Sequence, residues 1–470
     1  MKIKIKNLGI IENAEIDLKN DLIIFTGHNN TGKTYLNYLL FGLYKIPYGR
    51  IQKIFFPLVE IEDLSNEIIC LQTDFSKLFK EKITTILNIY ENLLKDYCKE
   101  IFANETINPE IKLLLEDSDI LEFDNLISVQ QKTENFVTGY TGIDLTDDKG
   151  ITETSKGIFK ITFDRVNSKH KQYIGFKEKV KDVIKLNIYL QIEWIFRKIA
   201  SFNHIYQREY KEIVYFFPAE RATLVQFTSD IIGNAFKNKR ENNPYPYETD
   251  ENPKRRTLKY QLAIENHMLY IHSISEIEKY KSDYSVLADE LENMLGGKVF
   301  IDPFGSIKFM PQNANDSLEM QMSSSTVKCL AVLVLYLRHE ARENDVLFID
   351  EPELNLHPKN QIFLARILAK LINKGVKIIL STHSDYVTKE LSSLVLLYKD
   401  RNEEDKYWEK YSLTEDMFID NEKVGLYYFD KTGCVNPHKI DEYGLDIEGF
   451  NEVIGAQSQM YDNIYFHVNI

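Results

Sequence analysis

Residues 27–34 have types and spacing that suit the binding of a phosphate group. The segment reads Gly-His-Asn-Asn-Thr-Gly-Lys-Thr, fits the pattern Gly-x-x-x-x-Gly-Lys-Thr, and lies between a short apolar run and a helical one. Glycines let backbone N–H groups surround phosphate oxygens, and the N-terminus of the following helix favours an anion. In this pattern Lys33 reaches the β- and γ-phosphates of a nucleotide, and the Thr34 hydroxyl ligates Mg²⁺. The residues expected to hold the nucleotide are Gly27, Asn29, Asn30, Thr31, Gly32, Lys33 and Thr34.

A second segment offers two carboxylates where such a ligand would bind. Residues 346–351 read Val-Leu-Phe-Ile-Asp-Glu, and the four apolar residues predict a buried strand with the acids at its C-terminal end. Ligands of open α/β sheets bind at that edge. Asp350 is expected to hold hydrated Mg²⁺, and Glu351 to polarise the attacking water as general base. A chance glycine turn and a solvated acidic turn are the alternatives, and the presence of both motifs in one chain argues against them.

The elements that must position these residues follow from the hydrophobic pattern. Short apolar or alternating runs predict strands, and large apolar residues at three- and four-residue spacing predict helices. Strands are expected over 2–6, 14–18, 22–26, 213–217, 298–301, 306–310, 345–350, 376–380, 394–398 and 424–430, and helices over 35–44, 75–97, 177–200, 257–295, 327–339 and 358–373. Strands that alternate with helices indicate a parallel sheet. We therefore expect an α/β fold with a mainly parallel sheet flanked by helices and an N-terminal antiparallel β element.

The separation of the two motifs predicts a long insertion. Lys33 and Asp350 are 317 residues apart, which is too far for a compact nucleotide-binding core. Residues 46–204 show helical spacing of apolar residues and are expected to form a mostly helical insertion, with a strand-prone stretch at about 125–164. The expected division is 1–45 for the first part of the core, 46–204 for the insertion, 205–400 for the rest of the core, and 401–470 for a small accessory element.

Two further segments resemble motifs of a known ATPase class. Residues 351–358, Glu-Pro-Glu-Leu-Asn-Leu-His-Pro, and 381–384, Ser-Thr-His-Ser, are similar to the Walker B/D-loop and switch-histidine motifs of ABC-type ATPases. The wording DEPELNLHP followed by STHS resembles the RecF/SMC/OLD branch and its AAA_15- and AAA_21-like families. The resemblance implies an ABC-type P-loop NTPase fold, ATP and Mg²⁺ as cofactors, and contact of His383 with the γ-phosphate; a helix-capping or packing histidine is the alternative. The phrases FPAER, SSSTVK and STHSDY also look similar to ATPase subunits of bacterial anti-phage systems such as PARIS and Septu.

The signature of that branch is altered in this chain. Residues 322–328, Met-Ser-Ser-Ser-Thr-Val-Lys, stand in place of the usual Leu-Ser-Ser-Gly, and Ser325 stands where glycine is expected. The resemblance implies that Ser323, Ser324 and Ser325 contact the phosphates of ATP, whereas an ordinary helix cap is the alternative. It also implies that these serines act on the ATP of a second, head-to-tail subunit, so a homodimer or higher homo-oligomer is expected.

The segment 217–221 ends the strand that follows the insertion. It reads Phe-Pro-Ala-Glu-Arg, at the place where ABC-type enzymes carry a loop that senses nucleotide and Mg²⁺. The glutamine expected in that loop is absent from this segment. Glu220 or Arg221 is therefore expected to substitute, with a structural ion pair as the alternative.

Composition restricts the partners and the compartment. The chain carries 57 Lys and Arg against 71 Asp and Glu, and this net charge of −14 argues against a surface that coats polyanions, although a local basic groove stays open. It has no apolar run of 18 residues and no signal-peptide pattern, and its four cysteines are scattered without metal or CxxC spacing. A cytoplasmic protein without membrane contact is expected.

These features predict an ATP-driven sensor or scaffold that controls a separate effector in anti-phage defence. Residues after 398 lack the Glu followed by a well-placed Asp-x-Asp of a fused TOPRIM nuclease, and they lack an HNH-like histidine cluster, so a TOPRIM or HNH nuclease on another chain is the expected effector. The alternative is a RecF-like repair ATPase that clamps DNA directly. A stand-alone nuclease is the third possibility and lacks the residues it would need.

Overall fold

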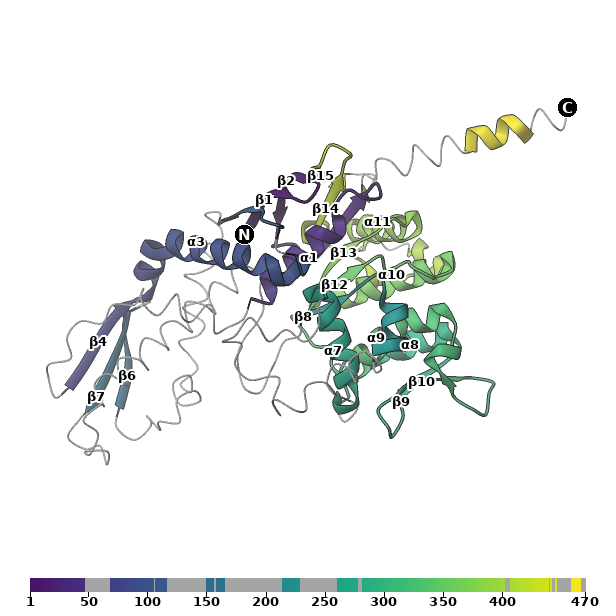
Figure 1. Ribbon diagram of the computed structural model, residues 1–470, viewed down its shortest axis with the longest axis horizontal. Coiled ribbons are helices and arrows are strands. Elements are labelled where there is room, and N and C mark those ends of the chain that lie inside the picture. Colours follow the sequence, from purple (N-terminus) through teal and green to yellow (C-terminus); the bar gives the residue numbers. More distant parts are fainter. Residues whose placement is uncertain are drawn as a thin grey trace. The chain divides into compact units, whose positions relative to one another are not determined.

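The structure is a computed structural model, and it describes residues 1–46, 68–104, 106–115, 149–155, 158–164, 214–228, 260–277, 281–401, 406–438, 440–441, 444–445 and 458–465 (Figure 1). The chain divides into two compact units. One comprises Met1–Lys4, Ile46–Asp96 and Ile111–Arg208, and the other comprises Ile5–Lys45, Tyr97–Glu110 and Glu209–Ile470. Both chemical motifs lie in the second unit.

The main sheet is mixed and mainly parallel. Its strand order is β5-β1-β2-β15-β14-β3-β13-β12-β8. The strands are β1 (Lys2–Leu8), β2 (Ile11–Asp17), β3 (Leu22–Gly27), β5 (Glu110–Leu114), β8 (Val214–Phe217), β12 (Val346–Asp350), β13 (Lys377–Ser381), β14 (Val424–Phe429) and β15 (Cys434–His438). From β14 to β8 all neighbours run parallel. Strands β1 and β2 are neighbours joined by two residues, a connection that antiparallel strands make. The expected α/β fold is confirmed.

The described residues also form helices and shorter segments. The helices are α1 (Lys33–Tyr44), α3 (Phe75–Phe102), α7 (Leu262–Ile277), α8 (Ser285–Leu295), α9 (Ser325–His339), α10 (Pro358–Asn373) and α11 (Asp385–Asp400). Short 3₁₀ segments are η3 (Met320–Met322), η4 (Tyr407–Tyr411), η5 (Glu415–Met417) and η6 (Asn421–Lys423), and β16 (Ile440–Asp441) pairs with β17 (Gly444–Leu445). The ranges expected for the helices at 35–44, 327–339 and 358–373 are confirmed within two residues at each end.

Strand β8 illustrates why the parallel strands are buried on both faces. The Phe216 ring points to one face, where its centroid lies 5.3 Å from that of Phe41 in α1. Tyr215 and Phe217 point to the other face, where their centroids lie 6.1 and 6.3 Å from that of Tyr336 in α9. Helices therefore cover both faces, and strands in that position read as continuous apolar runs.

Two smaller sheets are antiparallel. Strands β9 (Gly297–Ile301) and β10 (Ile307–Pro311) confirm the expected hairpin, and β11 (Leu318–Glu319) adds a third strand. In the first unit, β4 (Ile68–Asp74), β7 (Ile158–Asp164) and β6 (Lys149–Ser155) form another sheet in that order. The helix expected over 75–97 is confirmed by α3, and the one expected over 177–200 lies outside the described residues. Strands β6 and β7 lie in the stretch expected to be strand-prone, whereas the strands β4 and β5 were not predicted.

The single helix expected over 257–295 is wrong. Two helices, α7 and α8, occupy the described part of this range. Ser282 fixes the turn before α8, because its Oγ accepts a hydrogen bond from the Tyr284 amide (3.0 Å) and its carbonyl accepts one from the Ser285 amide (3.1 Å). Serine competes with helical hydrogen bonding in this way, and hydrophobic spacing does not record that competition.

The strand expected over 394–398 is also wrong. These residues belong to α11, which continues without interruption to Asp400. The buried positions of the helix include Val387, Leu391, Leu394 and Val395. Their three- and four-residue spacing is that of a helix face, and the apolar run at 394–398 includes Leu396 and Tyr398, which lie beside this face and are only partly buried.

The C-terminal segment supplies strands to the middle of the main sheet. The sequence predicts a small accessory element over 401–470, whereas β14 lies between β15 and β3 and pairs Phe429 with Gly27. The Tyr427 hydroxyl accepts a 2.8 Å hydrogen bond from the Asp17 amide, 410 positions away in the chain. The residue pattern predicts a strand here, but strand neighbours are set by tertiary packing rather than by local sequence.

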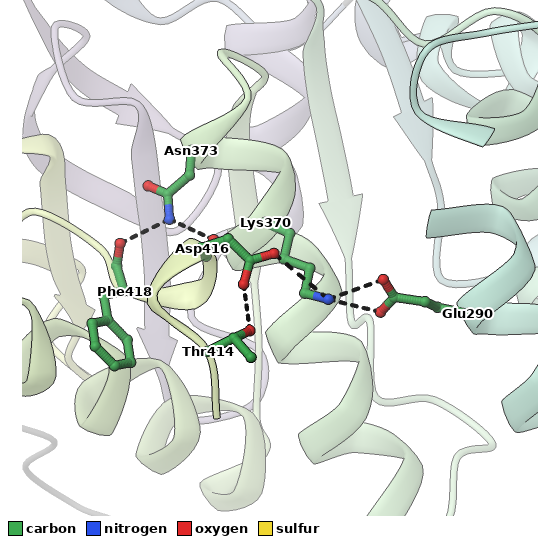
Figure 2. A network of polar contacts seen from close by, with 6 residues as sticks. All are labelled: Glu290, Lys370, Asn373, Thr414, Asp416 and Phe418. Atoms are coloured by element: carbon green, nitrogen blue, oxygen red, sulfur yellow. Dashed lines mark hydrogen bonds and ion pairs between the residues drawn. The ribbon is translucent and has the colours of Figure 1, made fainter. Parts of the chain in front are cut away.

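Helix α10 anchors the chain that leads into β14 (Figure 2). Lys370 binds both carboxylate oxygens of Glu290 in α8, each at 2.9 Å, and lies 3.7 Å from the Asp416 carboxylate. The side-chain amide of Asn373 donates to the carbonyls of Asp416 (2.9 Å) and Phe418 (2.8 Å). These contacts join α8, α10 and the segment before β14 into one framework.

Candidate functional site

The loop 27–34 leaves the C-terminal end of β3 and leads into α1. Gly27 has φ +127°, and a Cβ there would lie 2.3 Å from the Phe429 carbonyl oxygen. Gly32 has φ +96° and precedes α1 without a side-chain cap. Both conformations favour glycine, and the first amides of α1 are left without a capping side chain, as an anion site requires. The exposed side chains at the tip of the loop are His28, Asn29 and Asn30.

The Lys33 side chain folds back over this loop. It is 6% exposed, and its ammonium donates to the carbonyls of Gly27 (3.2 Å) and His28 and to the Thr31 hydroxyl (3.2 Å). Burial lowers the pKa of Lys33 to about 8, and nearby carboxylates oppose this shift. The carboxylates are those of Asp350, Glu351 and Glu353. A phosphate at the loop would give the ammonium an anionic partner and favour its charged form.

Asp350 ends β12 beside the loop. Its Oδ2 accepts a 2.9 Å hydrogen bond from the Thr34 hydroxyl, and its Oδ1 accepts one from the Ser381 hydroxyl at the end of β13. The side chain is 3% exposed; burial raises its pKa, and the bonds from Ser381 and Thr34 oppose the rise. The structure thus brings together the two residues, 316 positions apart, that the motifs predict to share a metal ion.

Asn37 borders Asp350 from the next turn of α1. It is fully buried, and it lies close enough to Asp350 to oppose the rise that burial causes in the pKa of that carboxyl. Within the described residues, neither its Oδ1 nor its Nδ2 has a hydrogen-bond partner. An unpaired buried amide destabilises a fold by about 1–3 kcal/mol, and a metal-bound water that paired with Asn37 would remove this cost. Hydroxyl, carboxylate and amide oxygens are ligands that suit Mg²⁺ and its water shell, so the residues present fit this ion.

Glu351 follows in a left-handed backbone conformation, with φ +47°. Such a conformation is uncommon for a residue other than glycine and persists where its surroundings hold it. Burial raises the pKa of Glu351, and the charges of Asp350 and Glu353 raise it further. A carboxylate with raised proton affinity suits the general-base role that the sequence predicts.

Glu353 connects the turn after β12 to the end of β13. Its carboxylate accepts hydrogen bonds from the Thr382 hydroxyl (2.9 Å) and the His383 amide (2.6 Å). Burial, and then the charge of Lys33, lower the pKa of His383 to about 4, so its imidazole is neutral at pH 7. A neutral imidazole has one N–H donor, and a hydrogen bond to the Gly27 backbone, which opposes the fall in this pKa, places the ring beside the phosphate-binding loop. Glu353 was not predicted as a site residue, although it lies in the same DEPE phrase as the two acids.

The three signature serines lie at the N-terminus of α9. Ser324 is the N-cap, and its hydroxyl accepts a 3.2 Å hydrogen bond from the Val327 amide. The buried Ser323 donates to the Glu319 carbonyl (3.1 Å), and Ser325 is exposed as the first residue of the helix. Among the hydrogen bonds of the described residues, none joins these serines to the phosphate-binding loop of the same chain.

Glu220 and Arg221 differ in their surroundings. Glu220 is exposed, whereas Arg221 is buried under the turn after β12 and donates to the Pro218 and Asp350 carbonyls. In the part of the chain that the structure describes, neither forms an ion pair. The sequence therefore pointed to Arg221 as a residue of interest, but not to its partners.

Comparison with known proteins assigns the chain to a family. The profile of the AAA ATPase domain family (AAA_15) matches residues 1–388, a range that includes both motifs. The chain belongs to the AAA ATPase domain family. Among solved structures, this AAA ATPase domain protein is similar to the "SmcHead bound to the C-winged helix domain of ScpA", with 12% identity over 93% of this chain and 96% of that chain and a TM-score of 0.31. No curated protein matches it.

The family places this AAA ATPase domain protein among the nucleotide-binding ATPases. Neither comparison names an anti-phage system, so the narrower resemblance to PARIS and Septu subunits stays a prediction. No helix of the described residues combines the length and the hydrophobicity needed to cross a membrane.

Proposed function

We propose that the chain hydrolyses ATP with Mg²⁺ and uses the reaction to change its state of assembly. The observation that carries the proposal is the 2.9 Å hydrogen bond from Thr34 to Asp350, because it joins the phosphate-binding loop and the acidic strand end at one point. Membership in the AAA ATPase domain family supports the choice of nucleotide. Mg²⁺, when bound, would neutralise the negative charge that the phosphates carry and develop.

The residues at this point take separate roles in the proposed reaction. Lys33 and the amides of the loop bind the β- and γ-phosphates, and Thr34 and Asp350 hold the metal. Glu351 accepts a proton from the attacking water, for which its raised pKa suits it. His383, neutral at pH 7, donates a hydrogen bond to the γ-phosphate.

Two substitutions test this assignment. Lys33→Ala removes the positive charge aimed at the phosphates, so ATP binding is expected to weaken and hydrolysis to stop. Glu351→Gln keeps the shape of the side chain and removes the base, so binding persists while hydrolysis slows by about 10²–10⁴-fold. Phosphate release and equilibrium binding of labelled ATP measure the two effects separately. Wild-type hydrolysis by the Lys33→Ala variant would refute the site.

We also propose that two copies complete each site head to tail. The serines at the start of α9 of one copy would contact the ATP held by the loop of the other. Ser324 uses its oxygen to accept from Val327, which leaves its hydroxyl hydrogen free to donate. The exposed Ser325 lies beside it at the helix N-terminus, where an anion is favoured. ATP would shift assembly only through such a contact, since a ligand acts on an equilibrium through differential affinity.

A mixing experiment tests the shared site. Lys33→Ala subunits and subunits with Ser323→Ala and Ser324→Ala are each expected to be inactive alone. A mixed dimer contains one site with both an intact loop and intact serines, so mixing is expected to restore hydrolysis. If mixed dimers form, as shown by differently tagged subunits, and no hydrolysis returns, the shared-site proposal is wrong.

We propose, finally, that the switch acts on a separate effector protein. The net charge of −14 and the use of β14 and β15 in the core sheet, rather than in a nuclease domain, support this choice. Binding to duplex DNA across a salt series tests it, because tight binding with a steep salt slope would instead indicate direct clamping of DNA. The nature of the effector as a TOPRIM or HNH nuclease, the cytoplasmic location and the defence role stay predictions from the sequence.

A further inference from the structure

Arg221 places a positive charge beneath the turn that contains Glu351. The arginine is 3% exposed. Its Nη1 donates to the carbonyls of Pro218 (3.0 Å) and Asp350 (2.9 Å), and its Nη2 donates to those of Glu351 (2.8 Å) and Pro352 (3.1 Å). Three of the four acceptors are therefore consecutive residues of a single turn.

The number of donors limits what else Arg221 can bind. A guanidinium has five N–H donors, and four of them are used by these carbonyls. The side chain is buried among the backbone of two strand ends rather than exposed to the phosphate-binding loop. A residue that senses nucleotide by direct contact would face the loop. Arg221 instead has the surroundings of a cation that fixes a backbone conformation.

The backbone that it fixes is an unfavourable one. Glu351 has φ +47°, where its Cβ crowds the backbone, and L-residues keep this conformation only where contacts on both sides hold it. On one side, the Glu351 amide donates to the Ser381 carbonyl at 3.0 Å. On the other side, the Glu351 carbonyl accepts from Arg221. The Glu351 carbonyl also accepts a 3.1 Å hydrogen bond from the Leu354 amide, so the guanidinium is one of three contacts that hold the peptide units around Glu351, and the one that a side chain supplies.

The fold brings Arg221 to this place by a short route. Strands β8 and β12 are parallel neighbours, with Phe217 opposite Ile349, so the turns that follow them leave the same edge of the sheet. Arg221 begins the helical turn after β8, where its own amide bonds to the Pro218 carbonyl at 3.2 Å. The guanidinium therefore links the ends of two strands that the sheet already holds in register, and the arginine side chain is long enough to span from one turn to the other.

We propose that Arg221 is a positioning residue for hydrolysis: its guanidinium holds the three carbonyls of residues 350–352 and keeps Glu351 in the left-handed conformation from which it acts. This inference rests on the proposed function, in which Glu351 is the general base. The contact of Arg221 with the Glu351 backbone does not depend on that function. Kinetic measurements test the catalytic role, and stability measurements test the backbone contact.

The first test is kinetic and uses Arg221→Lys. Lysine keeps the charge but lacks the planar fork, so one ammonium cannot reach all four carbonyls. A displacement of the base by about 1 Å is expected to lower kcat by about 100-fold, while KM and the binding of a non-hydrolysable ATP analogue change less than about threefold. Arg338→Lys is the matched control, because Arg338 pairs with Glu292 (2.7 Å) and Asp289 (3.0 Å) away from the site. It should keep wild-type kinetics.

The second test measures stability and needs no ATPase activity. Arg221→Lys is introduced into Glu351→Gln and into Glu351→Gly, and urea midpoints are compared. Glycine adopts positive φ without steric cost. The midpoint is therefore expected to fall clearly in the Gln background and less in the Gly background. If Arg221→Lys alone does not fold, the Glu351→Gly double variant is expected to fold and to supply the comparison.

The outcomes decide between the claims. Wild-type kcat in Arg221→Lys overturns the inference. Equal midpoint shifts in both backgrounds also overturn it, because Arg221 would then be a general packing residue. If the wild-type protein hydrolyses no ATP, the proposed function fails, and a smaller shift in the Gly background still supports the hold of Arg221 on residue 351.

Discussion

Nucleotide binding is expected to depend on the charge of Lys33 between pH 7 and pH 9. Burial lowers the pKa of this ammonium to about 8 in the free protein, with nearby carboxylates opposing the shift. A bound phosphate stabilises the charged form, so the pKa of Lys33 rises in the complex. Below pH 8 the ammonium is already charged and affinity is at its maximum. Above pH 8 the protein must take up a proton to bind, and affinity falls.

The magnitude follows from the free-state pKa. One unit above it, at pH 9, about one tenth of Lys33 carries its charge, so Kd is expected to be about tenfold higher than at pH 7. At pH 8 the increase is about twofold, because half of the side chains are charged. Linkage also requires an uptake of nearly one proton per nucleotide at pH 9 and of almost none at pH 7. The steepest change thus lies in a range where the γ-phosphate, with a pKa near 6, no longer titrates.

Titration calorimetry with a non-hydrolysable ATP analogue at fixed Mg²⁺ measures both quantities, with proton uptake obtained from buffers of different ionisation enthalpy. Lys33→Arg is the matched control: a guanidinium stays charged throughout, so this variant is expected to bind more weakly but with a Kd that does not change with pH. A wild-type Kd at pH 9 within twofold of that at pH 7 would refute the reasoning. The same slope in Lys33→Arg would assign it to another group.

Three further predictions concern single residues of the site. Gly27→Ala is expected to lower the free energy of unfolding by about 2–4 kcal/mol, because its Cβ would lie 2.3 Å from the Phe429 carbonyl oxygen and its φ is +127°. Gly9→Ala is the control, since Gly9 has φ +61° and open space around the Cβ, and it is expected to cost about 1 kcal/mol by urea denaturation. Asn37→Leu removes an unpaired buried amide, so it is expected to stabilise the free protein by about 1 kcal/mol. The same variant is expected to show a smaller rise in melting temperature with Mg²⁺ and an ATP analogue, and an unchanged rise would show that Asn37 does not face the metal. Glu353→Ala removes two hydrogen bonds, one of them from the His383 amide, and is expected to slow hydrolysis as much as His383→Ala does; full additivity in the double variant would contradict the link.

The residues that meet at the candidate site were predictable where they are neighbours in the chain. The glycines, Lys33 and Thr34 form one loop, and the two acids end one strand, so short patterns identify them. The sheet class was predictable for the same reason, because alternating runs of apolar residues indicate parallel strands between helices. That Thr34 meets Asp350 was expected from the chemistry of nucleotide sites, and the 2.9 Å contact agrees.

What escaped prediction depends on contacts between distant segments. The partners of Glu353 and Arg221 lie in other turns, the His383 amide for Glu353 and three consecutive carbonyls for Arg221, so the local patterns that include these two residues do not indicate their contacts. Asn37 is polar on a helix of apolar residues, and its burial could have drawn attention to it. The turn at Ser282 was missed because a hydroxyl that competes for backbone hydrogen bonds does not change hydrophobic spacing.

The position of β14 has a consequence for the synthesis of the protein. Strand β3, which leads into the phosphate-binding loop, cannot pair with β14 until residues 424–429 have left the ribosome. Likewise, the Asp17 amide cannot bond to the Tyr427 hydroxyl until 410 more residues have been translated. At about 5–20 residues per second, this delay lasts about 20–80 s. During it, β3 has an unpaired edge, which is a template for aggregation and a target for chaperones. A chain that stalls on the ribosome between residues 384 and 424 contains all the residues proposed to bind the nucleotide but lacks a strand of the sheet beneath them, so we expect the capacity to bind ATP to arise only after residues 424–429 have been translated.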